Sequence, residues 1–159
     1  MQKWFFLLFL ISLGFGSCSS IKTVRKTTEK RSTKIDKIVS NALKYKGVRY
    51  KFGGTTKRGM DCSGIVYVSY LQEKVQLPRV SRHMAKRGKK VSLRNAKKGD
   101  LLFFKTSKRS SRINHVGLIV SVKKNQIRFI HSTTSRGVII SSLLEKYWKN
   151  TFVKSKRIL

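Results

Sequence analysis

The apolar residues of this chain change their spacing near its middle, and this change constrains the fold more than any other feature. In the first half they recur with the period of an α-helix, whereas in the second half they gather in short β-branched and aromatic runs. Glycine, asparagine and lysine separate these runs, as in the turns of an antiparallel meander. The predicted strands are 100–105 (DLLFFK), 115–122 (HVGLIVSV), 126–132 (QIRFIHS), 137–141 (GVIIS) and 151–156. Helices followed by strands predict an α+β domain in which helices pack on an antiparallel sheet.

Two longer helices are expected ahead of the strands. Residues 35–46 place their apolar side chains at the i, i+3, i+4, i+7 spacing of one helical face and end before Gly47. A second helix over 62–74 has apolar residues on several sides, which is typical of a central buried helix, and Asp61 is a suitable N-cap for it. A short basic helix is expected within 81–88.

The first seventeen residues have the pattern of an export signal. One lysine precedes an apolar run that matches the core of a signal peptide and is too short to span a bilayer as a helix. Small residues then precede Cys18, which resembles the lipobox of bacterial lipoproteins, where the cysteine receives lipid and becomes the mature N-terminus. The alternative is a plain secretory signal with an incidental cysteine. We therefore predict a lipoprotein signal peptide (1–17), a lipidated basic tether (18–34) and a folded domain (35–159).

Export also decides how the two cysteines are interpreted. The predicted location is the cell envelope, with a lipid anchor on Cys18. In some bacteria an acidic residue directly after the lipidated cysteine keeps a lipoprotein out of the outer membrane. Ser19 occupies this position, which favours the outer membrane, facing the periplasm. If Cys18 carries lipid, Cys62 has no disulfide partner within the chain. A leftover thiol outside the cytosol is a candidate reactive residue.

The position of Cys62 at the expected helix start supports that interpretation. Unpaired N–H groups and the positive end of the helix dipole favour thiolate over thiol, and the thiolate is the nucleophile. The same N–H groups lie where a tetrahedral oxyanion would form. Asp61 is the opposing feature, since its carboxylate raises the pKa of a neighbouring thiol unless its charge is used in capping. The alternative is that Cys62 is only a buried core residue.

A cysteine nucleophile needs a base, and the chain offers only three histidines. His115 begins one predicted strand and His131 lies near the end of the next, so a hairpin would bring both imidazoles close on neighbouring strands. One can then take the proton from Cys62 while the other orients that base. His83 stands apart as a surface or groove residue. Zinc binding by the cysteine and the strand histidines is the weaker alternative, because no short ligand pair such as CxxC or HExxH is present.

Several short motifs lie along the chain in a definite order. They are 50–54 (YKFGG), 61–64 (DCSG), 77–82 (LPRVSR), 98–104 (KGDLLFF), 114–119 (NHVGLI) and 130–132 (IHS). In this order they resemble the motifs of the NlpC-type cell-wall peptidases, a family of papain-like cysteine peptidases that cut peptidoglycan stem peptides. The order and spacing hold from about residue 35 to residue 140.

The resemblance implies a role for each matching residue. Cys62 is the nucleophile, His115 the general base and acid, and His131 the residue that orients His115. Tyr50 matches a tyrosine that assists the oxyanion, and Ser63 a small polar position near the substrate. The implied fold is papain-like, with the nucleophile at a helix N-terminus, and no metal or organic cofactor is implied.

The charge of the chain limits its partners. Thirty-seven Lys and Arg against six Asp and Glu give a net charge of +31, which predicts attraction to polyanions. The basic residues are dispersed and the chain is expected to be exported. Carboxylate-rich peptidoglycan and anionic envelope surfaces are therefore better partners than nucleic acid. Two functional alternatives stay open: a non-hydrolytic wall-binding lipoprotein, and an amidase or acyltransferase that uses the same triad.

Overall fold

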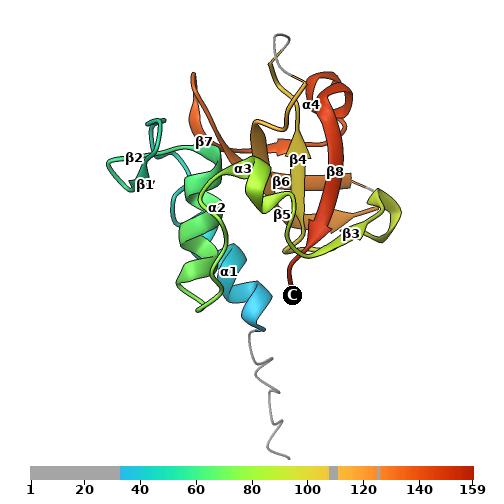
Figure 1. Ribbon diagram of the computed structural model, residues 1–159, viewed down its shortest axis with the longest axis horizontal. Helices are drawn as coiled ribbons and strands as arrows, with labels where there is room; N and C mark the ends of the chain where they lie inside the picture. The colour runs from blue at the N-terminus through green and yellow to red at the C-terminus, as the bar shows by residue number, and fades with distance from the viewer. Residues whose placement is uncertain (1–32, 108–110, 125) are drawn as a thin grey trace, which may run out of the picture. The chain divides into compact units, whose positions relative to one another are not determined.

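The computed structural model describes residues 33–107, 111–124 and 126–159. Two helices pack side by side against one face of an antiparallel sheet (Figure 1). The predicted signal peptide, the lipidation site at Cys18 and all but the end of the predicted tether lie outside these residues. Within the described part of the chain, no helix is both long enough and apolar enough to cross a membrane.

The main sheet has six strands in the order β3-β8-β4-β5-β6-β7, and every neighbouring pair is antiparallel. The α+β class with an antiparallel sheet is thus confirmed. Four consecutive strands form the expected meander, and β8 returns to pair with the first of them. The strands are β3 (Lys89–Val91), β4 (Leu101–Phe104), β5 (His115–Lys123), β6 (Gln126–Thr133), β7 (Gly137–Ser142) and β8 (Phe152–Arg157).

Both helices follow directly on a capping residue. In α1 (Lys34–Leu43) a capping box joins Thr33 to Asp36, and α2 (Cys62–Leu71) has Asp61 as its N-cap, as expected. Both helices end three residues earlier than the sequence pattern predicts, since the chain passes into turns there. The basic helix predicted in 81–88 is a single turn, α3 (Ser81–Met84).

The sheet is buried on both faces. Leu101 and Phe103 of β4 face α1 and α2, whereas Leu102 and Phe104 belong to a second apolar cluster on the opposite face. A short helix that the sequence pattern did not reveal, α4 (Lys146–Thr151), contributes Trp148 to this second cluster. Burial on both faces explains why β4 reads as an unbroken apolar run rather than an alternating one.

Two small elements complete the fold. A two-stranded hairpin, β1 (Thr55–Thr56) and β2 (Gly59–Met60), leads directly into Asp61 and α2. A 3₁₀ turn, η1 (Leu93–Asn95), connects β3 toward β4. The hairpin matters for function because it fixes the chain just before Cys62.

Candidate active site

The start of α2 is organised around the carboxylate of Asp61. One oxygen accepts the backbone N–H of Gly64 at 2.6 Å and the other accepts that of Gly53 at 2.8 Å. Arg79 binds both oxygens, at 2.9 and 2.8 Å. Burial alone would raise the pKa of Asp61, but the hydrogen bonds from Arg79 and Gly64 outweigh it and hold the pKa below its usual value. Asp61 therefore caps the helix, as expected, and its charge is neutralised by Arg79.

The glycines of the two leading motifs allow a close approach of the chain to α2. A Cβ on Gly64 would overlap the carbonyl oxygen of Gly54, and a Cβ on Gly54 would overlap the carbonyl of Gly59. The Gly53–Gly54 turn can therefore lie directly against the first turn of α2. This contact links the YKFGG and DCSG motifs physically and fixes the backbone of Cys62.

Cys62 is half-buried at the N-terminus of α2, and its Sγ lies 3.9 Å from the carbonyl oxygen of Asn114, the residue before His115. Burial raises the pKa of the thiol to about 11, and the charge of Asp61 adds to this effect. The backbone N–H groups of Cys62 and Ser63 lower this pKa, as expected of a helix N-terminus, but desolvation of the charged form outweighs them and the resting thiol is protonated.

The two strand histidines lie in contact, as the hairpin prediction required. Nε2 of His115 is 3.0 Å from Nδ1 of His131, and Nε2 of His131 is 3.0 Å from Oγ of Ser141 on β7. Burial lowers the pKa of His115 to about 4. Burial also lowers the pKa of His131, and the nearby charges of His115 and Arg136 lower it further. Both rings are therefore neutral at pH 7, and Nδ1 of His115 is the nitrogen of that ring that is not used in the contact between the two imidazoles.

Aromatic side chains enclose the histidine pair. Trp148 stacks on His115 with ring centroids 5.2 Å apart and meets His131 edge-on at 4.5 Å. Phe129 covers His131 at 4.8 Å. This enclosure excludes water from the imidazoles, which is the physical cause of their lowered pKa values.

A groove with two halves passes over Cys62. One half is a pocket of about 480 Å³ that includes His115 and Trp148, and the other, of about 710 Å³, includes Ser63 and Arg79. The two halves share the same three residues, namely Tyr50, Cys62 and Asn114. The thiol thus lies at the junction of two spaces, as required of a group that attacks the middle of an extended substrate.

The two minor candidates occupy different positions. Burial raises the pKa of Tyr50, as do the charges of Cys62 and Asp61, so its hydroxyl stays a hydrogen-bond donor beside the thiol at neutral pH. The Ser63 hydroxyl donates to Asp61 at 3.2 Å and accepts from Arg79 at 2.8 Å. Ser63 is thus part of the network that supports the helix start.

Three residues of the site were missed by sequence reasoning. Arg79 lies inside the LPRVSR motif, which could have suggested a partner for Asp61. Ser141 and Trp148 carried no signal, because one depends on the register of β7 and the other on an unpredicted helix. Among the described residues, no group of three His, Cys, Asp or Glu side chains is placed to hold a metal ion.

The site combines a thiol at the start of a buried helix with a buried imidazole pair on an antiparallel sheet. This is the arrangement of papain-like cysteine enzymes. The chain belongs to the NlpC/P60 family, whose profile matches residues 47–157. The family resemblance and the papain-like fold predicted from the sequence are thereby confirmed.

Known relatives differ in how much of their length this chain matches. It is 40% identical over 124 residues to the murein DD-endopeptidase MepS/murein LD-carboxypeptidase of Escherichia coli (strain K12), covering 77% of this chain and 62% of that protein. The chain thus spans about three fifths of that relative. A probable endopeptidase of Haemophilus influenzae is 32% identical over 160 residues, covering 96% of each chain. A solved structure from Staphylococcus aureus, described as similar to lipoprotein, NLP/P60 family, has a TM-score of 0.69 at 28% identity. That match covers 83% of this chain and 45% of the other.

Proposed function

We propose that this protein is a cysteine peptidase that hydrolyses amide bonds in peptidoglycan stem peptides. The observation that carries the proposal is that Cys62 and His115 line one pocket while His131 holds the far nitrogen of His115. Family membership supports it, as do the names of the relatives, which are murein endopeptidases or probable endopeptidases.

Catalysis follows from a neutral resting pair. Nδ1 of His115 takes the thiol proton as Sγ of Cys62 attacks the amide carbonyl, so that charge develops only during reaction. His115 then gives this proton to the departing amine, the C–N bond breaks and a thioester remains. Water attacks the thioester with His115 again acting as base, which releases the carboxylic acid and restores the thiol.

The oxyanion that forms in each step needs donors that are already in place. The N–H groups of the first turn of α2 and the protonated hydroxyl of Tyr50 are the proposed donors. We assign Ser63 to the substrate side of the groove. The support is that its hydroxyl hydrogen-bonds to both Asp61 and Arg79 and so completes their network.

Release of new muropeptides from purified peptidoglycan tests the proposal. Cys62→Ser should lower release at least about a thousandfold, because a serine hydroxyl has no comparably reactive anion here. Ser92→Ala, at an exposed position outside both halves of the groove, is the matched control and should retain activity. Full hydrolysis by Cys62→Ser would exclude the nucleophile assignment, and a wild-type protein that binds the wall without cleaving it would favour the wall-binding alternative.

The proposed location is the cell envelope, with a lipid anchor on Cys18 and the outer membrane, facing the periplasm, as its site. The support is the lipobox-like sequence at residues 16–18. Cys18→Ala should move the protein from the membrane fraction to the soluble fraction. Unchanged membrane fractionation of this variant contradicts lipidation.

We further propose that anionic lipid surfaces contact one edge of the sheet, which we call the basic edge: Lys86, Arg87, Lys89, Lys90, Lys154 and Lys156. Lys89 and Lys90 lie on β3, the edge strand, and pair with Arg157 and Lys156 of β8. Like charges directly opposite each other destabilise a sheet. Their concentration at an edge therefore supports binding to a surface of opposite charge.

A further inference from the structure

Ser141 is a buried polar residue with one partner in the site and no role in the scheme above. It lies on β7, is 3% exposed and is paired with Phe129 in the register of β6 and β7. Its Oγ lies 3.0 Å from Nε2 of His131. A buried hydroxyl can accept an N–H from the outer nitrogen of the histidine pair or donate to its lone pair, so this contact is coupled to which nitrogen of the ring carries the proton.

The protons of the two rings are linked through their shared hydrogen bond. For His115 to accept a proton from Cys62, its Nδ1 must be unprotonated and its single proton must lie on Nε2. That Nε2–H then donates to Nδ1 of His131. His131 must therefore carry its own proton on Nε2, whose hydrogen-bond partner among the described residues is Oγ of Ser141.

We propose that Ser141 is a positioning residue that fixes the tautomer of both histidines by accepting the Nε2–H of His131. The inference rests on the proposed function, since it takes His115 to be the base. The proposal links four groups in series, and each group sets the proton position of its neighbour. The groups are Cys62, His115, His131 and Ser141.

The opposite tautomer would inactivate the site. If His131 carried its proton on Nδ1, it would donate to Nε2 of His115, and the proton of His115 would move to Nδ1, facing Cys62. The thiol would then have no acceptor. Burial keeps both rings neutral, so the alternative is this reversed state rather than a doubly protonated ring.

Water cannot easily replace the serine hydroxyl. His131 is 0% exposed and is covered by Phe129 and Trp148. The void left by one hydroxyl is smaller than the roughly 30 Å³ that a water molecule occupies in the liquid. Loss of Oγ therefore leaves the Nε2–H of His131 without an acceptor, which favours the reversed tautomer.

The matched pair Ser141→Thr and Ser141→Val tests the proposal, since the two side chains have the same shape and differ in the hydroxyl. Nitrogen NMR of the full protein with labelled histidine reads the tautomers without requiring turnover. Wild type and Ser141→Thr should show both rings protonated on Nε2. Ser141→Val should show Nδ1–H forms of both rings and a rate of Cys62 alkylation at least about tenfold lower.

Several outcomes overturn the proposal. One is an unchanged tautomer in Ser141→Val, and another is a loss of alkylation rate with the tautomers intact. If Ser141→Val does not fold, Ser141→Ala is measured in the same way. Failure to cleave peptidoglycan, with the tautomers behaving as expected, would count against the proposed function and leave the role of Ser141 standing.

Discussion

Asp61 lies next to Cys62, the proposed nucleophile, and is only 8% exposed, so its negative charge would oppose formation of a thiolate if it were left alone. The two hydrogen bonds from Arg79 reduce this conflict, although the charge of Asp61 still raises the pKa of Cys62. They also keep the carboxylate ionised, which lets it cap α2 through Gly64. Arg79 thus lets Asp61 cap the helix beside the proposed nucleophile while the charge of the carboxylate is largely neutralised.

Replacement of Arg79 should reveal both roles. Arg79→Ala leaves a largely buried carboxylate without its partner, which costs about 3 kcal/mol of unfolding free energy. It should also raise the pKa of Cys62 further, because Asp61 would act on the thiol unopposed. Urea unfolding measures the first effect, and the pH dependence of Cys62 alkylation measures the second.

The ion pair between Lys98 and Asp36 is the matched control. Its side chains are 42% and 36% exposed, so water screens the pair and it contributes little to stability. Lys98→Ala should therefore change stability little and Cys62 reactivity not at all. An Arg79→Ala protein as stable and as reactive as Lys98→Ala would contradict the neutralising role of Arg79.

The buried histidines predict a loss of stability in mild acid. The pKa of His115 falls from 6.5 in the unfolded chain to about 4 in the folded protein. Between these values the unfolded state binds the proton better, so stability is full above pH 6.5 and falls as the pH drops toward 4. The loss from His115 alone is at most about 3 kcal/mol.

Urea unfolding at pH 7 and pH 4.5 measures this loss. His115→Gln removes one of the two titrating imidazoles and should make the dependence between pH 6.5 and pH 4 less steep, leaving the part contributed by His131, whose pKa is also lowered by burial. Asp61 and Asp36 titrate below this window, because their pKa values are lowered rather than raised. A resting thiolate–imidazolium pair predicts the opposite sign, since it would raise the pKa of His115. Stability that increases on acidification would therefore show that the resting pair is charged.

At the scale of elements, the position of Cys62 depends on how closely the Gly53–Gly54 turn approaches α2. Gly64→Ala places a methyl group against the carbonyl of Gly54, which is backbone and cannot rotate away. We expect a loss of about 1–3 kcal/mol in stability and at least a tenfold loss of kcat, because the turn and Cys62 must separate.

Gly47→Ala provides the comparison. Its left-handed backbone, with φ of 86°, makes alanine unfavourable there, yet the space around it is open and it lies away from the groove. This variant should lose about 1 kcal/mol of stability and keep its kcat per folded molecule. Equal kcat values for the two variants would show that the contact between the turn and α2 does not set the position of Cys62.

Elements with a clear apolar pattern were predictable from the sequence, and the others were not. The strands of the meander, α1 and α2 bury regular apolar faces, and their starts carry capping residues. By contrast, β3 consists of two lysines and a valine, and α4 is a six-residue helix without a side-chain cap. Tertiary packing of Trp148, rather than local preference, holds α4 in place.

The same distinction applies within the site. Cys62, His115 and His131 could be selected because few cysteines and histidines exist in the chain. Ser141 could not, because many serines are available and only the register of β6 against β7 brings this one to His131. The raised pKa of Cys62 was also beyond the sequence, since it reflects burial by residues distant in the chain.

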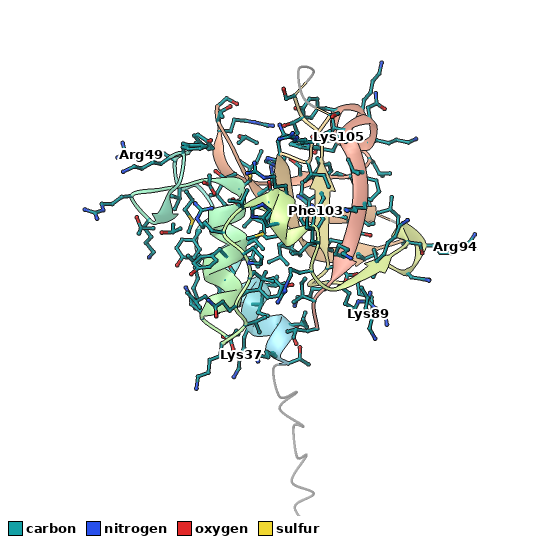
Figure 2. All side chains as sticks on the ribbon, viewed as in Figure 1. Lys37, Arg49, Lys89, Arg94, Phe103 and Lys105 are labelled. Atoms are coloured by element: carbon teal, nitrogen blue, oxygen red, sulfur yellow. The ribbon has the colours of Figure 1, made fainter. Side chains whose placement is uncertain are left out.

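At the scale of the whole molecule, positive charge covers the surface on many sides. Figure 2 shows Lys37, Arg49, Lys89, Arg94 and Lys105 directed outward from different parts of the fold, with Phe103 inside. Only three ion pairs join cations to carboxylates among the described residues. The basic edge lies at the end of the sheet formed by β3 and β8. The histidine pair lies on β5 and β6, toward the other end of the sheet, which is formed by β7. Contact with a surface through the basic edge would therefore leave the groove accessible.

Charge reversal separates this edge from the general charge of the protein. Lys86→Glu, Lys89→Glu and Lys90→Glu combined should weaken binding to phosphatidylglycerol vesicles at least about a hundredfold, since each basic residue near an anionic surface contributes about 1 kcal/mol. Reversal of the exposed Lys46, Lys57 and Lys123 changes net charge equally and should weaken binding less than about tenfold.

Lys90→Glu alone should stabilise the fold by a few tenths of a kcal/mol, because it replaces a like-charge pair with Lys156 by an attractive one. Equal losses for the two triple variants would assign binding to net charge alone. A gain in stability together with a loss of vesicle binding would mean that the edge keeps its lysines at a cost to the fold, as expected of a surface selected for its partner.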